Sequence, residues 1–432
     1  MSFSSNRRTP GLRAFGCTVF PGTLAFLPRR AVAQSAYRLA PEKLAEAVRL
    51  GHIRTALHFG LELWLIGALV LLLRLGVCAA LAERIRRLTP RVWLQFVLFS
   101  FSLILLLYCV VELPITALGH WAMLAYRISI QSWPSWLRDQ AMMLGFLVAI
   151  GVPVLVFAEW LTRWSPRRYW LWFWVASIPL ILLGALVLPA IIEPIFDHFE
   201  PLALTHPELV NQLEHVVART GTSIPAERMF LMRASEKGNG LNAYVTGLGP
   251  TRRIVVWDTT ADRIPRDEIL FIFAHESGHY VLHHVALGIA LGIVGTLTLL
   301  WLTAQLAEWL VKRYGRQWKV GSLASPSGIV VLLLALFIFE AITEPVGNSI
   351  SRAIEHQADV YGQEAIHGIV ADPQSTAVST FNHLGEAWLE DPNPGAFVEF
   401  WTYDHPSTKS RADFAARYNP WAAGGHPRYF QK

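Results

Sequence analysis

The sequence predicts a mainly α-helical protein that crosses a membrane several times and carries a small polar α+β domain. Of its 432 residues, 53% are hydrophobic and only 16% are charged, which leaves too little polar surface to cover a soluble protein of this size. Six stretches are long and apolar enough to cross a hydrocarbon core about 30 Å thick. Two further regions return to polar residues, turn formers and amphipathic periodicity, as expected of a domain in water.

The apolar stretches fall into two groups. The first four lie within residues 34–192 and the last two within 285–346; they cover approximately 57–82, 93–118, 141–161, 169–192, 285–309 and 326–346. Several contain an ionisable residue, such as Glu62 or Glu344, which would be costly to expose to lipid. We therefore expect these side chains to face protein or a water-filled interior.

Residues 1–33 precede these stretches and have the pattern of a targeting segment. Basic residues are followed by a modest apolar run over 15–27 and then by the small residues Ala31, Val32 and Ala33. This order is typical of a secretory signal peptide, although Pro21 interrupts the apolar run. A cleaved signal peptide and a retained signal anchor are both open interpretations.

The polar regions cover residues 193–284 and 347–432. In the first, the periodicity of residues 207–218 predicts a surface helix with a proline at its start. Residues 228–233 predict a strand, and a glycine-rich turn followed by a β-branched strand is expected within 246–258. The second region follows the last apolar stretch directly, and we expect it to complete the same domain.

A helix that begins near Pro265 carries the residues that most strongly suggest a metal site. Proline suits a first helical turn, and the acidic residues after it suit the positive end of the helix dipole. The helix continues into His275-Glu-Ser-Gly-His279. Because residues four apart share a helical face, both imidazoles can bind one ion, while Glu276 can reach a water beside it. The alternative is a pair of surface histidines on a polar helix.

A third ligand is expected just after the last apolar stretch, because a catalytic zinc takes three protein ligands and leaves one position open. Glu355 and Asp359 are four residues apart. On a helix facing the first, Glu355 could bind the ion while Asp359 accepts a hydrogen bond from a ligand histidine; an exposed acidic helix face is the alternative. A fourth protein ligand would close the site, so we interpret three other histidines as ordinary polar residues: His283, His284 and His356.

Further segments complete a recognisable pattern. They are residues 242–247 with the strand that ends at 257–259, the HESGH helix, residues 351–359, and Asp404-His-Pro-Ser407 followed by Arg411; residues 130–133 and Asp139 lie upstream. In order and spacing, over about residues 190–420, they resemble the CAAX prenyl protease 1-like membrane subfamily of the M48 zinc metallopeptidases.

This resemblance implies a zincin-like α+β metallopeptidase domain with one Zn²⁺ ion per chain. His275, His279 and Glu355 would be its ligands, and Glu276 would be the general base and acid. The chemistry agrees with these roles, since zinc polarises a scissile carbonyl and acidifies water, and a carboxylate can carry the proton to the leaving amine.

The resemblance also assigns the residues around the metal. Asn242 would bind substrate in the cleft, and His405 would be catalytic by donating to the negative charge that develops on the carbonyl oxygen. Asp359 and Arg411 would not bind the metal but would lie next to its ligands and hold them in orientation by hydrogen bonding.

The predicted function is that of a membrane-embedded zinc endopeptidase acting on peptides or proteins. Its substrates could be CaaX-like or could be membrane or exported proteins. The alternative from another class is a non-enzymatic membrane transporter or a metal-dependent scaffold. The basic residues lie in short runs beside apolar stretches, which favours contact with a lipid bilayer over binding of nucleic acid.

The distribution of Lys and Arg predicts how the chain is oriented. These residues are concentrated in the loops at 83–92, 162–168 and 310–325, and are sparse in the loop at 119–140. The positive-inside rule places the basic loops in the cytoplasm. The HESGH region is then expected on the extracytoplasmic face, which is periplasmic in a bacterium.

Overall fold

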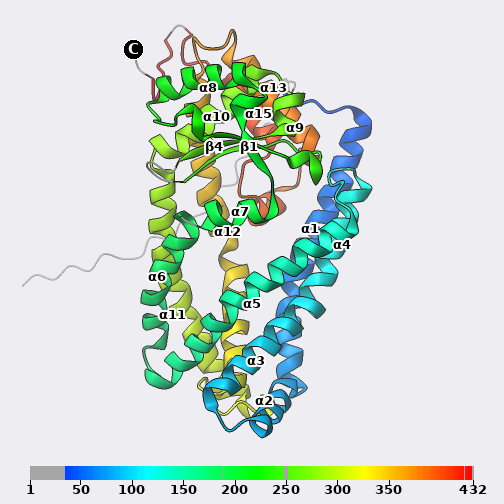
Figure 1. Ribbon diagram of the computed structural model, residues 1–432, viewed down its shortest axis with the longest axis vertical. Helices are drawn as coiled ribbons and strands as arrows, with labels where there is room; N and C mark the ends of the chain where they lie inside the picture. Colours follow the sequence, from blue (N-terminus) through cyan, green and yellow to red (C-terminus); the bar gives the residue numbers. More distant parts are fainter. Residues whose placement is uncertain (1–34, 187, 248–251, 423, 431–432) are drawn as a thin grey trace, which may run out of the picture. The chain divides into compact units, whose positions relative to one another are not determined.

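Within the described part of the chain, five long helical segments are candidates to span a membrane (Figure 1). The computed structural model describes residues 35–186, 188–247, 252–422 and 424–430, which belong to the unit Ser35–Lys432. The candidate signal peptide or anchor at 1–33 lies outside them. Among the described residues, the helices long and apolar enough to span a bilayer are α1 (Pro41–Arg74), the run Val92–Ala125, α5 (Trp133–Trp164), α11 (His284–Trp318) and α12 (Pro326–Ala365).

The predicted count of six spans is not confirmed. The stretch expected at 169–192 is helical on both sides of residue 187, which lies outside the described residues, as α6 (Tyr169–Leu186) and α7 (Leu188–Phe196). Its described apolar helix, Tyr169–Ala185, is shorter than the other five.

All five spanning segments depart from the predicted boundaries; α5, α11 and α12 extend beyond the stretches expected at 141–161, 285–309 and 326–346, and the first two segments also differ in how they are built. The first, expected at 57–82, begins at Pro41 and ends at Arg74. Gly76 adopts a left-handed φ of 70°, which glycine accepts without steric cost, and a separate helix, α2 (Val77–Leu88), follows. The second span is interrupted, since α3 and α4 are joined by a π-helical turn: Val92–Leu106, Leu107–Glu112 and Leu113–Ala125.

Two ionisable residues expected to face protein meet between α1 and α12. Nε2 of His58 lies 3.2 Å from Oε2 of Glu344 and 3.7 Å from Oε1 of Glu62. The three side chains are about a quarter to a third exposed. Glu62 and Glu344 therefore face other parts of the chain, as expected, whereas Arg74 and Glu340, for which the same was expected, are exposed.

The basic loops lie at the end of the membrane helices away from the sheet (Figure 1). The α2 helix, which carries much of the first loop, contacts α12, and Nε of Arg163 donates to the carbonyl of Ala324 at 2.9 Å. The sparsely charged loop at 119–140 leads instead to the polar domain, where Oδ2 of Asp139 lies 2.9 Å from Nζ of Lys237. Basic loops and polar domain thus lie at opposite ends of the helices.

The polar domain is built on a four-stranded sheet with the order β1-β2-β4-β3. The central pair, β2 and β4, is parallel, and the outer pairs are antiparallel. The strands predicted at 228–233 and within 246–258 are confirmed as β2 and β4, whereas β1 and β3 were not predicted. Residues 248–251 of the expected turn lie outside the described residues. The bounds are Phe199–Pro201 (β1), Met229–Met232 (β2), Ala243–Thr246 (β3) and Arg253–Trp257 (β4).

Helices pack against this sheet around a shared hydrophobic core that includes Leu213, Phe273 and Phe381. The predicted helix at 207–218 is confirmed as α8, and α10 runs through the core with most of its side chains buried. The helices are α8 (Pro207–Thr220), α9 (Asp258–Arg263), α10 (Arg266–Val281), α13 (Pro373–Trp388), α14 (Ala396–Thr402) and α15 (Thr408–Arg417), with 3₁₀ turns at Leu202–Leu204, Ala226–Arg228 and Ala234–Glu236.

The 40-residue helix α12 links the membrane part to the polar domain. It begins as the last spanning helix and continues into the domain, where it packs closely on α10. A Cβ atom at Gly362 would lie 2.9 Å from the backbone nitrogen of His275 and 3.0 Å from its Cα. Glycine therefore permits the close approach of the two helices beside the HESGH motif.

Gly362→Ala is expected to lower the free energy of unfolding by about 1–3 kcal/mol, the usual cost of over-packing a filled interior. The backbone of His275 cannot move aside as the end of a flexible side chain would. Thermal or denaturant unfolding in detergent measures the effect. The matched control is Gly347→Ala on the same helix, where nothing lies within 4 Å of the added Cβ. An equal loss of stability in both variants would contradict the close packing at Gly362.

Candidate metal centre

Two histidines from α10 and one glutamate from α12 converge on a single point. The Nε2 atoms of His275 and His279 lie 3.2 Å apart. The carboxylate oxygens of Glu355 lie 3.2 Å from Nε2 of His275 and 3.4 Å from Nε2 of His279. Ligand atoms held about 2.0–2.2 Å from a tetrahedral zinc are roughly 3.3–3.6 Å from one another. The spacing and the His₂Glu chemistry of these donors therefore fit a zinc ion.

The protonation of these residues also suits a cation. Burial and the neighbouring His275 lower the pKa of His279 to about 3, so the ring is neutral and its nitrogen can bind a metal. Burial opposes ionisation of Glu355, but hydrogen bonding to His275 and nearby positive charge lower its pKa to about 2. Burial would likewise lower the pKa of His275, yet Asp359 and Glu355 raise it to about 9. A metal ion would replace the proton held there.

Asp359 and Arg411 support His275 from the side away from Glu355. Oδ1 of Asp359 lies 3.0 Å from Nδ1 of His275. Arg411, on α15, donates to both oxygens of Asp359, from Nε at 2.9 Å and from Nη2 at 2.6 Å. Burial would raise the pKa of Asp359, but the Arg411 guanidinium holds it well below its usual range. This bidentate pair fixes a buried acceptor behind the histidine.

Glu276 lies between the converging donors and strand β3. It lines two cavities, one shared with His279 and Glu355 and the other with His275. It also forms a hydrogen bond with the backbone of Val245 on β3. Burial raises the pKa of its carboxyl group. A raised pKa suits a group that must accept a proton and return it near neutral pH.

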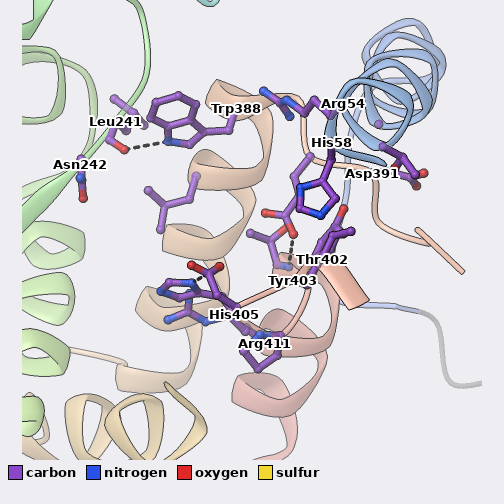
Figure 2. A pocket seen from close by; sticks show the side chains of 17 residues that line it. Arg54, His58, Leu241, Asn242, Trp388, Asp391, Thr402, Tyr403, His405 and Arg411 are labelled. Carbon is purple, nitrogen blue, oxygen red and sulfur yellow. Dashed lines mark hydrogen bonds and ion pairs between the residues drawn. The ribbon is translucent and has the colours of Figure 1, made fainter. Parts of the chain in front are cut away.

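The cleft beside these residues is large. A cavity of about 810 Å³ lies between the segment of Leu241 and Asn242, helix α1 with Arg54 and His58, and the wall that carries His405 (Figure 2). A second cavity of about 400 Å³ lies along α10, the start of α11 and α12, and a small one of about 120 Å³ lies beside the centre. His279 and Glu355 line the second cavity and His275 lines the small one, whereas the large cavity reaches the site at Asn242, His405 and Arg411.

His405 is the one predicted site residue that lines all three of these cavities. Its Nε2 lies 3.3 Å from Oε2 of Glu355, and its Nδ1 lies 2.8 Å from Oδ1 of Asp404. The side chain is half-exposed. Because Nδ1 faces the Asp404 carboxylate, it carries a hydrogen. This is true both of the neutral tautomer protonated at Nδ1 and of the doubly protonated ring, and only in the second is Nε2 also a donor.

The structure brings together all the residues predicted for the site, around one centre: Asn242, His275, Glu276, His279, Glu355, Asp359, His405 and Arg411. Two nearby histidines, predicted to be ordinary polar residues, lie away from the three converging donors. His283 is exposed, and His356 is exposed with its ring packed on Phe414.

Sequence reasoning missed two residues near the centre. His284 was interpreted as an ordinary polar residue, but its Nδ1 lies 3.3 Å from Nδ1 of His279. Trp388, on α13, lines the large cavity and donates from Nε1 to the carbonyl of Leu241 at 2.9 Å. Neither residue belongs to a motif with regular spacing, so no sequence signal pointed to them.

The sequence matches two family models. Residues 203–418 match peptidase family M48, and residues 29–198 match a domain described as CAAX prenyl protease N-terminal, five membrane helices. Both matches agree with the resemblance found in the motifs. Together they extend over the membrane part and the polar domain.

Several curated proteins are similar in sequence. An uncharacterized metalloprotease, YhfN, from Bacillus subtilis is 31% identical over 381 residues, which cover 88% of this chain and 87% of YhfN. A CAAX prenyl protease 1 homolog from Dictyostelium discoideum is 28% identical over 53% of each chain. CAAX prenyl protease 1 from Saccharomyces cerevisiae is 25% identical over 59% of this chain and 58% of its own length. The matches to these two proteases span little more than half of their lengths.

A solved structure has the same fold. The crystal structure of S. mikatae Ste24p superimposes with a TM-score of 0.74, covering 88% of this chain and 90% of Ste24p at 20% sequence identity. The architecture of spanning helices with a small sheet-containing domain is therefore shared with Ste24p.

Proposed function

The chain belongs to peptidase family M48 and is a membrane metalloprotease, and on this basis we propose that it is a zinc-dependent endopeptidase. In this proposal His275, His279 and Glu355 hold one Zn²⁺ ion, and Glu276 transfers the proton. The observation that carries it is the convergence of the three donors at 3.2–3.4 Å, beside Glu276 and at the edge of a large cleft. Family membership favours this function over the transporter or scaffold that the sequence also allowed.

The proposed chemistry is hydrolysis of a peptide bond by water. When bound, zinc supplies Lewis acidity, which polarises the scissile carbonyl and acidifies the attacking water. Glu276 accepts the proton of that water and passes it to the nitrogen of the leaving amine. When the ring of His405 is doubly protonated, with Nδ1 donating to Asp404, its Nε2–H can donate to the carbonyl oxygen as negative charge develops there.

The substrate would bind as an extended chain along β3. This strand is at the edge of the sheet. The Val245 carbonyl already accepts from the Tyr280 hydroxyl at 3.3 Å, and the remaining outward backbone groups can pair with a peptide in the manner of an added strand. Asn242 precedes β3 and lines the large cavity, where its side-chain amide could fix the peptide backbone. The two larger cavities would then hold the parts of the substrate on either side of the cleaved bond.

Several features support a substrate from a membrane-associated or exported protein. The second cavity is lined by His284 and Val285 at the start of α11 and by Ser351 and Ile354 on α12, two helices that are long and apolar enough to span a bilayer. The basic loops lie at the other end of the helices, which by the positive-inside rule favours an extracytoplasmic catalytic face. A reporter fused after Lys432 and active only in the cytoplasm would contradict this orientation.

The function is tested with the full chain purified in detergent. We expect it to cleave internal bonds of unstructured peptides, to lose that activity with a zinc chelator, and to recover it on addition of zinc but not magnesium. Parallel assays use unmodified peptides and a farnesylated CaaX peptide. If only the farnesylated peptide were cleaved, the substrates would be prenylated CaaX proteins and not membrane-associated or exported proteins in general. Undiminished hydrolysis in the fully chelated, zinc-free protein would contradict zinc-dependent catalysis.

A further inference from the structure

The helix that carries the HESGH motif ends in an unusual turn. Between α10 and α11, His283 adopts a left-handed backbone conformation with φ of 59°, which is uncommon for residues other than glycine, although asparagine, aspartate and histidine adopt it more often than the rest. Its own side chain is exposed. On an uninterrupted helix, residues five apart would point in directions about 140° apart. The turn at His283 instead directs His284 back toward His279.

His284 is buried against the far side of the His279 ring. Its side chain is 6% exposed, its ring lies edge-on to that of His279 with centroids 5.2 Å apart, and the two Nδ1 atoms are 3.3 Å apart. Nε2 of His279 points toward His275 and Glu355. A neutral imidazole that binds a metal through Nε2 carries its hydrogen on Nδ1, so His279 can donate to the lone pair on Nδ1 of His284.

A third residue fixes the orientation of His284. Its side chain is hydrogen-bonded to that of Gln357, which lies on α12 close to Glu355. Nε2 of Gln357 donates to the carbonyl of Ala353 at 3.3 Å, which leaves Oε1 as the acceptor. With Nδ1 of His284 facing His279, Nε2 is the ring nitrogen of His284 that is left to donate to Gln357.

We propose that His284 is a positioning residue that orients His279 as a metal ligand through two hydrogen bonds in series. Nδ1–H of His279 donates to Nδ1 of His284, and His284 in turn donates to Gln357. This inference rests on the proposed zinc site. It gives each ligand histidine its own acceptor: His275 has the carboxylate of Asp359, and His279 has the neutral ring of His284. Acceptors of this kind fix the ring and the tautomer that binds the ion. The turn at His283 serves to bring the second acceptor into place.

The test compares zinc affinity among four variants of the full chain in detergent, by competition with a chelator of known affinity. His284→Phe keeps a ring but removes the acceptor, and should raise the Kd for zinc by about 10–100-fold. His284→Asn restores an acceptor close to the position of Nδ1 and should recover most of the affinity. Gln357→Leu removes the outer acceptor and should weaken binding less. His283→Asn tolerates the left-handed turn and should bind zinc as the wild type does.

Two further readouts separate positioning from a structural role. The thermal unfolding midpoint of the metal-free protein should be the same in His284→Phe and the wild type, and the absorption spectrum of the cobalt-substituted protein should change in His284→Phe and return in His284→Asn. Wild-type affinity in His284→Phe, or equal weakening in His284→Phe and His284→Asn, would overturn the proposal. A wild-type chain that binds no zinc would instead contradict the zinc site itself.

Discussion

Replacing Glu276 by glutamine is expected to reduce peptide hydrolysis by at least about 10³-fold while zinc stays bound. The amide keeps the size and nearly the shape of the carboxyl group but cannot accept a proton, and general acid–base catalysis typically contributes about 10²–10⁴-fold. Glu276 is not one of the three converging donors, so its loss leaves the metal ligands intact. Single-turnover cleavage of a peptide, with zinc content measured on the same sample, separates the two effects.

Asp267→Asn is the control for this variant. Asp267 lies in the first turn of the same helix and is exposed, so the substitution makes the same chemical change far from the cleft. It should retain close to full activity. If Glu276→Gln were as active as Asp267→Asn with equal zinc content, Glu276 could not be the group that transfers the proton.

Replacing Glu355 by alanine is expected to weaken zinc binding by more than about 100-fold. Loss of a residue that only supports a ligand costs about 10–100-fold in metal affinity, and removal of one of three ligands should cost more. The remaining pair, His275 and His279, would also lose the negative charge that balances the ion. Zinc content after dialysis against a weak chelator, together with the zinc Kd, measures the effect.

His356→Ala is the matched control for Glu355→Ala. The two residues are adjacent on α12, but His356 is exposed and packs on Phe414 away from the converging donors. Its removal should leave zinc affinity unchanged. Full zinc retention in Glu355→Ala would exclude Glu355 as a ligand, and equal zinc loss in both variants would point to a general disturbance of α12.

Local periodicity explains why much of the centre could be predicted from the sequence. His275 and His279 are one helical turn apart, so any helix through them brings both imidazoles to one face. Glu355 and Asp359 have the same spacing. Although they are distant in sequence from the two histidines, they reach them once α12 packs against α10. The small residues at the contact, among them Gly362 beside His275, made that packing possible but carried no motif of their own.

The features that were missed depend on breaks in periodicity. The first span could not be bounded because apolar residues continue past the turn at Gly76 into α2. His284 was set aside because spacing alone places it on a different face from His279. Only the left-handed backbone of His283 directs it back, and such a conformation cannot be inferred from the residue type.

Diffraction data collected on either side of the zinc absorption edge, from crystals of the active wild-type protein, would locate the ion itself. We expect one anomalous peak per chain, about 2.0–2.2 Å from Nε2 of His275, from Nε2 of His279 and from a carboxylate oxygen of Glu355. A zinc peak held by other residues, or no peak at this position in protein that still cleaves peptides, would contradict the proposed zinc site.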